Sequence, residues 1–358
     1  MAGVAPVARD HLVWKRTTVD GRPALYGEAG AGLPVVFLHG WGLGQHSYKR
    51  ALKRLVRLGC QVFAPALPGF GGTGDLVGDR FSFAGYAEWL DHFLDAVGVD
   101  EPVFLVGHSF GGGVAIAFAH AHTDRVRTLV LVNSVGGSAW KAGQAVRSMA
   151  QRPLWDWGIH FPSDLLPLPQ VRRVLPVILE DALPNLLRNP RGVWRVGQLA
   201  RVADLTAELE ELKQRELPVV VLWGDKDRIV PRASFEALCV AVGSDGEVVK
   251  GNHSWLLADP DAFGEVMTNT VAVAQLARSL EQKEDQPPAR RRGVLGLVRA
   301  RPRRLRSIRG ARPSDEIDQG ADAGDAAELS SRPGPQPRHA LTPPVGGGRR
   351  PGGRPGGG

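Results

Sequence analysis

The sequence predicts an α/β fold in which a mostly parallel sheet carries helices on its faces. Apolar runs, typical of strands buried on both faces, recur at 33–38, 103–106 and 218–223, and the strand predicted over 126–132 ends in the apolar run 129–132. Amphipathic segments with helical periodicity, such as 82–97, separate these runs. The apolar fraction of 43% is ordinary for a protein that buries a sizeable core.

The elements follow one another in an alternating order. A hairpin is predicted over 12–28, because Asp20-Gly21 favours a tight turn between two strand-like runs. The remaining predicted elements are strands and helices in the following order: strand 33–38, helix 48–58, strand 61–65, helix 82–97, strand 103–106, helix 110–120, strand 126–132, helical segments within 137–212 that include 171–180 and 193–212, strand 218–223, strand 247–250 and helix 261–279.

The charge of the chain is unevenly divided. The 358 residues carry a formal net charge of +7. Residues 286–358 hold 15 Arg, no Lys and 6 acidic residues, hence +9, whereas 1–285 carry −2. Because the folded part is nearly neutral, we expect no nucleic-acid partner.

The compartment is predicted from what the sequence lacks. It has no apolar run of 18 or more residues, and 1–10 show no signal-peptide pattern. Cys60 and Cys239 form neither a disulfide framework nor a metal-ligand spacing, and we expect both to be buried. We therefore expect a cytoplasmic protein.

The end of the chain, 286–358, is rich in Arg, Pro and Gly, and we expect it to be disordered. Within it, 290–312 carry 10 Arg interspersed with apolar residues. One interpretation is a weak peripheral contact with anionic lipid or an acidic partner. The other is a solvated tail, which we favour because blocks of like charge are usually disordered.

The most informative stretch is Gly107-His108-Ser109-Phe110-Gly111, which joins a strand-like run to a helix-like segment. A nucleophile on such a sharp turn stands clear of the sheet, and the flanking glycines permit the strained backbone. The backbone N–H of Phe110 would lie at a helix N-terminus, where it can stabilise a developing oxyanion. The pattern predicts Ser109 as the nucleophile.

Four motifs agree in order and spacing: His39-Gly40-Trp41-Gly42, the serine turn 107–111, Gly224-Asp225-Lys226-Asp227 and Gly251-Asn252-His253-Ser254-Trp255. Together they resemble the α/β-hydrolase superfamily, in particular its cap-bearing serine hydrolases and esterases, over residues 10–280. The sequence departs from the family's pattern at Ala66, where most relatives carry an acidic residue.

The resemblance implies a catalytic triad of Ser109, Asp227 and His253. His253 would act as general base and then acid, and Asp227 would accept a hydrogen bond from its Nδ1–H. Asp225 is the rival for the acid, with turn formation as its alternative role. Some hydrolases place the acid at the position of Asn133, which is not a carboxylate here.

The resemblance also implies an oxyanion hole made by the backbone N–H groups of Trp41 and Phe110. The side chain of His39 would then shape the loop by hydrogen bonding. Trp255 is predicted to contribute to an apolar substrate pocket, although aromatic residues of this kind also occur simply as core.

The implied architecture is a doubly wound, mostly parallel eight-stranded sheet with a helical cap. The first part of the core would span 10–136, the cap 137–212, the second part of the core 213–282 and the disordered tail 286–358. A cap is expected because a single crossover does not need about 75 residues.

The implied function is hydrolysis of a carboxylic ester, or a related acyl substrate with a small hydrophobic or aromatic group, through an acyl-enzyme. Neither a metal nor an organic cofactor is expected. Alternatives on the same triad are C–C bond hydrolysis and cofactor-free perhydrolysis, and a further alternative is a non-catalytic binding module of the same fold. The natural substrate, the acyl chain length and the oligomeric state stay open.

Overall fold

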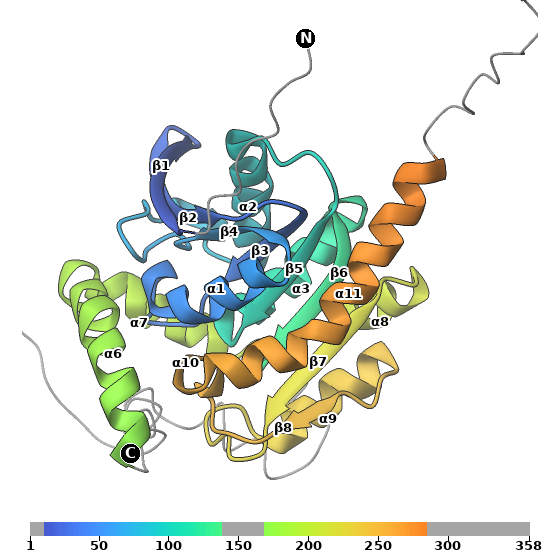
Figure 1. Cartoon of the computed structure of the whole chain (residues 1–358). Coiled ribbons are helices and arrows are strands. Elements are labelled where there is room, and N and C mark those ends of the chain that lie inside the picture. The colour runs from blue at the N-terminus through green and yellow to red at the C-terminus, as the bar shows by residue number, and fades with distance from the viewer. Residues whose placement is uncertain (1–10, 138–167, 285–358) are drawn as a thin grey trace, which may run out of the picture. The chain divides into compact units, whose positions relative to one another are not determined.

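The computed structural model describes residues 11–137 and 168–284. Eight strands form one sheet in the order β1-β2-β4-β3-β5-β6-β7-β8 (Figure 1). The strands are β1 (Val13–Val19), β2 (Arg22–Ala29), β3 (Leu33–Leu38), β4 (Cys60–Pro65), β5 (Val103–His108), β6 (Val126–Val132), β7 (Val219–Gly224) and β8 (Glu247–Val249). β2 pairs antiparallel with β1 and β4, and the other neighbours pair in parallel. The predicted eight-stranded, mostly parallel sheet is confirmed.

The hairpin of β1 and β2 has the predicted turn. Asp20 and Gly21 have φ of 50° and 72°, and Val19 pairs directly with Arg22. Two central residues with positive φ match the right-handed twist of the flanking strands.

Helices cover the sheet on two faces (Figure 1). On one face, α2 (Phe83–Val97), α3 (Phe110–Ala121), α8 (Thr206–Gln214) and α9 (Arg232–Val242) pack in a row. On the other face, α1 (Lys49–Arg57), α10 (Trp255–Ala258) and α11 (Pro260–Glu284) pack together. Short 3₁₀ helices η1 (Gln45–Tyr48), η2 (Gly78–Arg80) and η3 (Thr123–Arg125) join some of these elements.

The central strand β5 shows why the apolar runs are continuous. Val103 and Leu105 belong to the core cluster on one face, whereas Phe104 and Val106 belong to the cluster on the other. All four are fully buried. A strand covered on both faces needs apolar residues at every position.

The chain between β6 and β7 contains α6 (Leu168–Arg188), α7 (Pro190–Arg201) and α8. Helix α6 packs against η1, α7 and α10, whereas α8 packs against α3 and α9 in the layer over the sheet. The predicted cap boundary at 212 therefore lies inside a helix of that layer. Residues 138–167 of the predicted cap lie outside the described residues.

The helical segment predicted over 193–212 is helical but is not continuous, because the helix is interrupted between α7 and α8. Leu205 N–H donates to Gly136 O at 2.9 Å, and Asp204 forms an isolated bridge with Gly136. These backbone bonds tie the segment to the end of β6, so it cannot continue the helix. Asp204 Oδ1 then accepts from the Thr206 hydroxyl at 2.8 Å as α8 begins.

By its internal contacts the chain divides into two units, 1–290 and 291–358. The second unit and the predicted tail from 286 lie outside the described residues, as do 1–10. Within the part that is described, no helix is both long enough and apolar enough to cross a bilayer.

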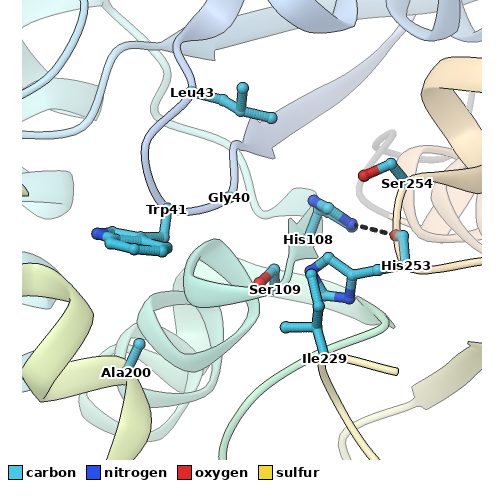
Figure 2. A pocket seen from close by; sticks show the side chains of 9 residues that line it. All are labelled: Gly40, Trp41, Leu43, His108, Ser109, Ala200, Ile229, His253 and Ser254. Carbon is cyan, nitrogen blue, oxygen red and sulfur yellow. Dashed lines mark hydrogen bonds between the residues drawn. The ribbon is translucent and has the colours of Figure 1, made fainter. Parts of the chain in front are cut away.

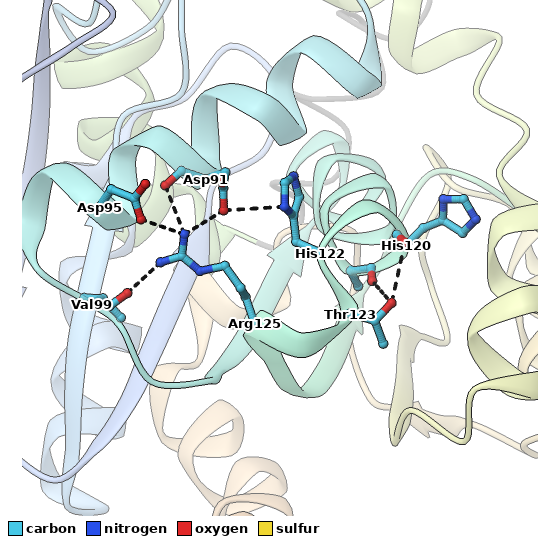
Figure 3. A network of polar contacts seen from close by, with 8 residues as sticks. Asp91, Asp95, Val99, His120, His122, Thr123 and Arg125 are labelled. Atoms are coloured by element: carbon cyan, nitrogen blue, oxygen red, sulfur yellow. Dashed lines mark hydrogen bonds and ion pairs between the residues drawn. The ribbon is translucent and has the colours of Figure 1, made fainter.

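A polar network around Arg125 ties η3 to α2 (Figure 3). The Arg125 guanidinium donates to Asp91 Oδ1 at 2.6 Å, to Asp95 Oδ1 at 2.8 Å and to Val99 O at 2.7 Å. The His122 ring lies 3.5 Å from Asp91 Oδ1. The Arg125 side chain is only 16% exposed, so water cannot readily replace these bonds.

We expect Arg125→Met to lower the free energy of unfolding by about 2 kcal/mol, because a partly buried carbonyl and two carboxylates lose their donor. Urea unfolding measures the change. Arg16→Met, at an exposed position of β1, is the control and should change stability by no more than about 0.5 kcal/mol. Equal stabilities of the two variants would contradict the prediction.

Candidate active site

Ser109 lies on a sharp turn between β5 and α3. Its backbone has φ 54° and ψ −118°, a conformation that costs about 1–3 kcal/mol for a residue with a side chain. The turn is held from both sides, because Ser109 N–H donates to Val132 O at 3.0 Å and Ser109 O accepts from Gly112 N–H at 2.9 Å. This geometry lifts the Ser109 side chain above the end of the sheet.

Two glycines allow the turn to close against its neighbours. A Cβ on Gly107 would lie 2.5 Å from the carbonyl oxygen of Gly111. A Cβ on Gly111 would lie 2.6 Å from the carbonyl oxygen of His39. The start of α3 therefore lies directly against the loop that follows β3, and this contact brings the predicted oxyanion donors onto neighbouring segments.

Asp227 follows β7 and is buried, with 7% of its surface exposed. Its Oδ2 accepts from His253 Nδ1 at 2.8 Å. Its Oδ1 accepts from the backbone N–H groups of Ile229 at 2.7 Å and Val230 at 2.9 Å. These bonds fix the carboxylate so that it orients the imidazole.

The structure places Asp227, and not its rival Asp225, against the histidine. Asp225 is exposed, and its Oδ1 accepts from Gly251 N–H at 2.8 Å. Asp225 N–H also donates to Val249 O at 2.9 Å. Asp225 thus joins the loop that follows β7 to the end of β8 and the loop after it, through its carboxylate and its backbone N–H.

Asn133, at the end of β6, supports the acid, a role that the sequence reasoning missed. Asn133 Nδ2 donates to Asp227 Oδ2 at 2.5 Å, and Asn133 Oδ1 accepts from Trp255 Nε1 at 2.8 Å. Asn133 also has a positive φ of 45°. The position of Asn133 in the sequence could have predicted this role, because the end of β6 lies beside the end of β7 in a parallel sheet.

Trp255 lies behind the candidate triad. It is 2% exposed and packs against Phe263 with ring centroids 6.0 Å apart. It is not among the described residues that line the pocket. This placement does not support the predicted contact between Trp255 and the substrate. The indole N–H instead donates a hydrogen bond to Asn133.

The loop after β3 is shaped by His39, which is fully buried. Its Nδ1–H donates to Gly40 O at 2.9 Å, and its Nε2 accepts from Leu67 N–H at 2.9 Å. The neighbouring Trp41 is anchored through its indole, which donates to Val193 O in α7 at 2.7 Å. His39 therefore holds the loop as a neutral imidazole.

Helix α6 also holds this loop, through buried polar side chains that the sequence reasoning did not single out. Asp181 Oδ2 accepts from Ser47 N–H at 2.8 Å and from Ser47 Oγ–H at 2.6 Å. Asn185 Nδ2 donates to Gly42 O at 3.1 Å. The sequence could have indicated this pair, because Asp181 and Asn185 are four residues apart and so lie on one face of the helix.

Ser109 and His253 line one pocket, where Figure 2 shows them as neighbours. The pocket holds about 440 Å³ of empty space including its open mouth. Its apolar walls are Leu43, Ala200 and Ile229, which come from the loop after β3, from α7 and from the loop after β7. The full lining is Gly40, Trp41, Leu43, His108, Ser109, Ala200, Ile229, His253 and Ser254.

The side chain of Phe110 lies in the core and does not line the described pocket. The phenyl ring is fully buried and packs against Phe83 and Tyr86, with centroids 5.6 and 5.2 Å away. Phe110 is the first residue of α3, so its backbone N–H has no partner within the helix.

Burial keeps two histidines near the site uncharged. It lowers the pKa of His39 to about 4. Burial, together with the nearby His253, lowers the pKa of His108 to about 3. Both titrate near 6.5 when unfolded. Below pH 6.5 the unfolded chain therefore binds protons that the native state excludes.

The stability that these histidines contribute is complete above pH 6.5 and is lost as the pH falls toward their native pKa values. Between pH 6 and 5 we expect the free energy of unfolding to fall by about 1 kcal/mol for each histidine. Urea unfolding at both pH values measures the loss. His108→Gln should lose about half of this dependence, and an unchanged dependence in that variant would contradict the assignment.

The sequence model described as the alpha/beta hydrolase family matches residues 35–266. An uncharacterised protein of Mycobacterium tuberculosis (strain H37Rv) is 28% identical over 272 residues, which cover 70% of this chain and 78% of that protein. The 2-hydroxymuconate semialdehyde hydrolase of Pseudomonas sp. (strain CF600) is 38% identical over 221 residues, which cover 57% of this chain and 74% of that protein.

Among solved structures, a membrane phospholipase A described as a bacterial virulence factor superposes with a TM-score of 0.60. It is 22% identical, and the match covers 74% of this chain and 87% of that one. At this identity the likeness concerns the fold.

Proposed function

Because the chain belongs to the alpha/beta hydrolase family, we propose that it is a serine hydrolase that cleaves a carboxylic ester with a hydrophobic group. The observation that carries the proposal is the buried Asp227–His253 pair, 2.8 Å between oxygen and Nδ1, in one pocket with Ser109. A nucleophile, a base and a carboxylate that orients the base are the parts that acyl transfer requires.

In the first step, Ser109 Oγ attacks the carbonyl carbon of the ester while His253 Nε2 takes the hydroxyl proton. The C–O bond to the alcohol then breaks, and the imidazolium gives its proton to the leaving oxygen. In the second step, His253 takes a proton from water, whose oxygen attacks the acyl-enzyme. The bond to Ser109 breaks, the acid leaves and Ser109 regains its proton.

We propose the N–H groups of Trp41 and Phe110 as the donors that hold the oxyanion. The position of Phe110 at the start of α3 supports this role, because helix N-termini favour negative charge. The anchoring of the Trp41 indole on Val193 supports a fixed loop geometry. Loss of one such donor typically costs on the order of 10²–10³ in rate.

The character of the pocket supports an uncharged acyl group. Leu43, Ala200 and Ile229 supply apolar walls, and none of the described residues that line the pocket is a lysine, arginine, aspartate or glutamate. An apolar wall favours a hydrophobic substrate, whereas a free carboxylate would lose its hydration without a cation to pair with. We also propose that α6 and α7 form the cap over this pocket.

A second candidate is C–C bond hydrolysis on the same triad. The 38% identity to a protein named 2-hydroxymuconate semialdehyde hydrolase favours it. Perhydrolysis uses the same triad as well, and a binding role on this fold would need no turnover at all.

The test is hydrolysis of p-nitrophenyl esters of increasing acyl length, set against 2-hydroxymuconate semialdehyde as the competing substrate. We expect ester turnover with an optimum that reflects the apolar walls, and kcat/KM higher than for the semialdehyde. A preference for the semialdehyde would favour the second candidate. A folded protein that turns over neither substrate would contradict both.

A further inference from the structure

The mechanism leaves His108 without a role, although this residue directly precedes the nucleophile. It is 1% exposed, and both of its ring nitrogens have partners. Nδ1 lies 2.8 Å from the hydroxyl of Tyr48. Nε2 lies 2.9 Å from the backbone carbonyl of His253, a bond that Figure 2 shows. The Tyr48 hydroxyl is in turn 3.0 Å from the backbone N–H of Gly40.

The protons in this chain of bonds can be assigned. The carbonyl of His253 only accepts, so His108 carries its proton on Nε2. Because burial keeps the ring neutral, Nδ1 is an acceptor and the Tyr48 O–H donates to it. The Tyr48 oxygen then accepts from Gly40 N–H. Every donor and acceptor is matched in this single arrangement.

The chain of bonds joins three segments that catalysis needs. Gly40 directly precedes Trp41, the proposed oxyanion donor, and His108 directly precedes Ser109. At the far end, the bonded carbonyl belongs to His253, the base. A Cβ on Gly40 would lie only 3.0 Å from His108 Nδ1, so the loop and the histidine are closely packed.

We propose that Tyr48 and His108 form a positioning relay that fixes the loop after β3, which carries Trp41, and the loop of His253 relative to Ser109. The inference rests on the proposed serine hydrolase function. Neither residue touches the reacting atoms in this role. Each acts by holding the backbone from which a catalytic group projects, and misplacement of such a group by about 1 Å costs on the order of 100-fold in rate.

The relay is tested with variants that remove one member at a time. Tyr48→Phe deletes the hydroxyl, and His108→Leu deletes both ring nitrogens. His108→Gln offers an amide oxygen and an amide N–H in place of the acceptor and the donor. Tyr26→Phe is the matched control, because Tyr26 is a buried tyrosine of β2 that packs against Phe93 outside the relay.

The readouts are kcat and KM on a p-nitrophenyl ester at a temperature well below unfolding, and the rate at which a fluorophosphonate labels Ser109. Both are expressed per folded protein. We expect Tyr48→Phe and His108→Leu to lower kcat and the labelling rate by about 10–100-fold with KM nearly unchanged. His108→Gln should recover part of the loss, and Tyr26→Phe should match the wild type.

A merely structural role gives a different result. It would lower the unfolding temperature of the variants but leave kcat and the labelling rate per folded molecule at the wild-type values, which would overturn the proposal. A second criterion is coupling. The double variant Tyr48→Phe/His108→Leu should lose no more activity than the worse single variant, whereas multiplied losses would overturn the relay.

The assigned proton positions have a signature that does not depend on turnover. In ¹⁵N spectra of the histidine rings at neutral pH, His108 should show a protonated Nε2 and an unprotonated Nδ1, and Tyr48→Phe should shift the Nδ1 resonance. A proton on Nδ1 would overturn the relay even if esters are cleaved. If no ester is cleaved and Ser109 is not labelled, the proposed function fails. The ¹⁵N spectrum would still show whether Tyr48 and His108 form the proposed hydrogen bonds.

Discussion

Ser109→Ala is expected to lower kcat/KM for ester hydrolysis by about 10⁴-fold or more. Without Oγ there is no atom to form the acyl-enzyme, so only the proposed oxyanion donors and substrate binding would remain to assist attack by water. KM should change little, because a methyl group in place of CH₂OH leaves the pocket walls intact. Initial rates with a p-nitrophenyl ester of the preferred acyl length measure the effect.

The pocket contains a second serine hydroxyl, so the prediction must distinguish between two possible nucleophiles. Ser254 also lines the pocket, but it follows His253 at the start of α10 and has ordinary backbone geometry with φ −102°. Of these two serines, only Ser109 lies on the strained turn that is typical of a nucleophile. Turnover that survives Ser109→Ala but disappears in Ser254→Ala would show that the nucleophile assignment is wrong.

Asp227→Asn is expected to lower kcat on the order of 10⁴-fold, with KM nearly unchanged. The amide cannot match all the donors that now face the carboxylate: one oxygen accepts from His253 and Asn133, and the other accepts from two backbone N–H groups. An amide N–H toward the ring would favour the wrong tautomer of His253, which then could not accept the Ser109 proton.

Asp225→Asn is the matched control for this prediction. Its Oδ1 accepts from Gly251 N–H, and the amide oxygen of asparagine can accept the same bond. We therefore expect kcat within about threefold of the wild type, in keeping with the small effect of most exposed substitutions. A loss in Asp225→Asn that equals or exceeds the loss in Asp227→Asn would contradict the assignment of the acid.

The sheet was predictable because burial on both faces leaves a local signature. The run 103–106 is apolar at every position, and the structure divides it between two core clusters. The break between α7 and α8 was not predictable in this way. It depends on backbone bonds between Leu205 and Gly136, residues that are distant in the sequence.

The candidate triad was accessible from the sequence because the motifs that follow the strands resemble, in order and spacing, those of a family whose triad they imply. The supporting groups were not, since their partners lie far along the chain. Asn133 meets Asp227 and Trp255 across the sheet, and Tyr48 meets His108 only through the fold. Periodicity cannot tell whether an indole near the candidate catalytic histidine faces the pocket or the core, and Trp255 faces the core.

The most direct test of the account is covalent labelling of the full chain by a fluorophosphonate, followed by intact mass spectrometry and peptide mapping. A serine activated by His253 and held beside oxyanion donors attacks phosphorus and displaces fluoride. We predict one adduct per chain, located on Ser109 and absent from Ser109→Ala. A folded protein that takes up no label, or an adduct on another residue, would contradict the assignment of Ser109 as the activated nucleophile.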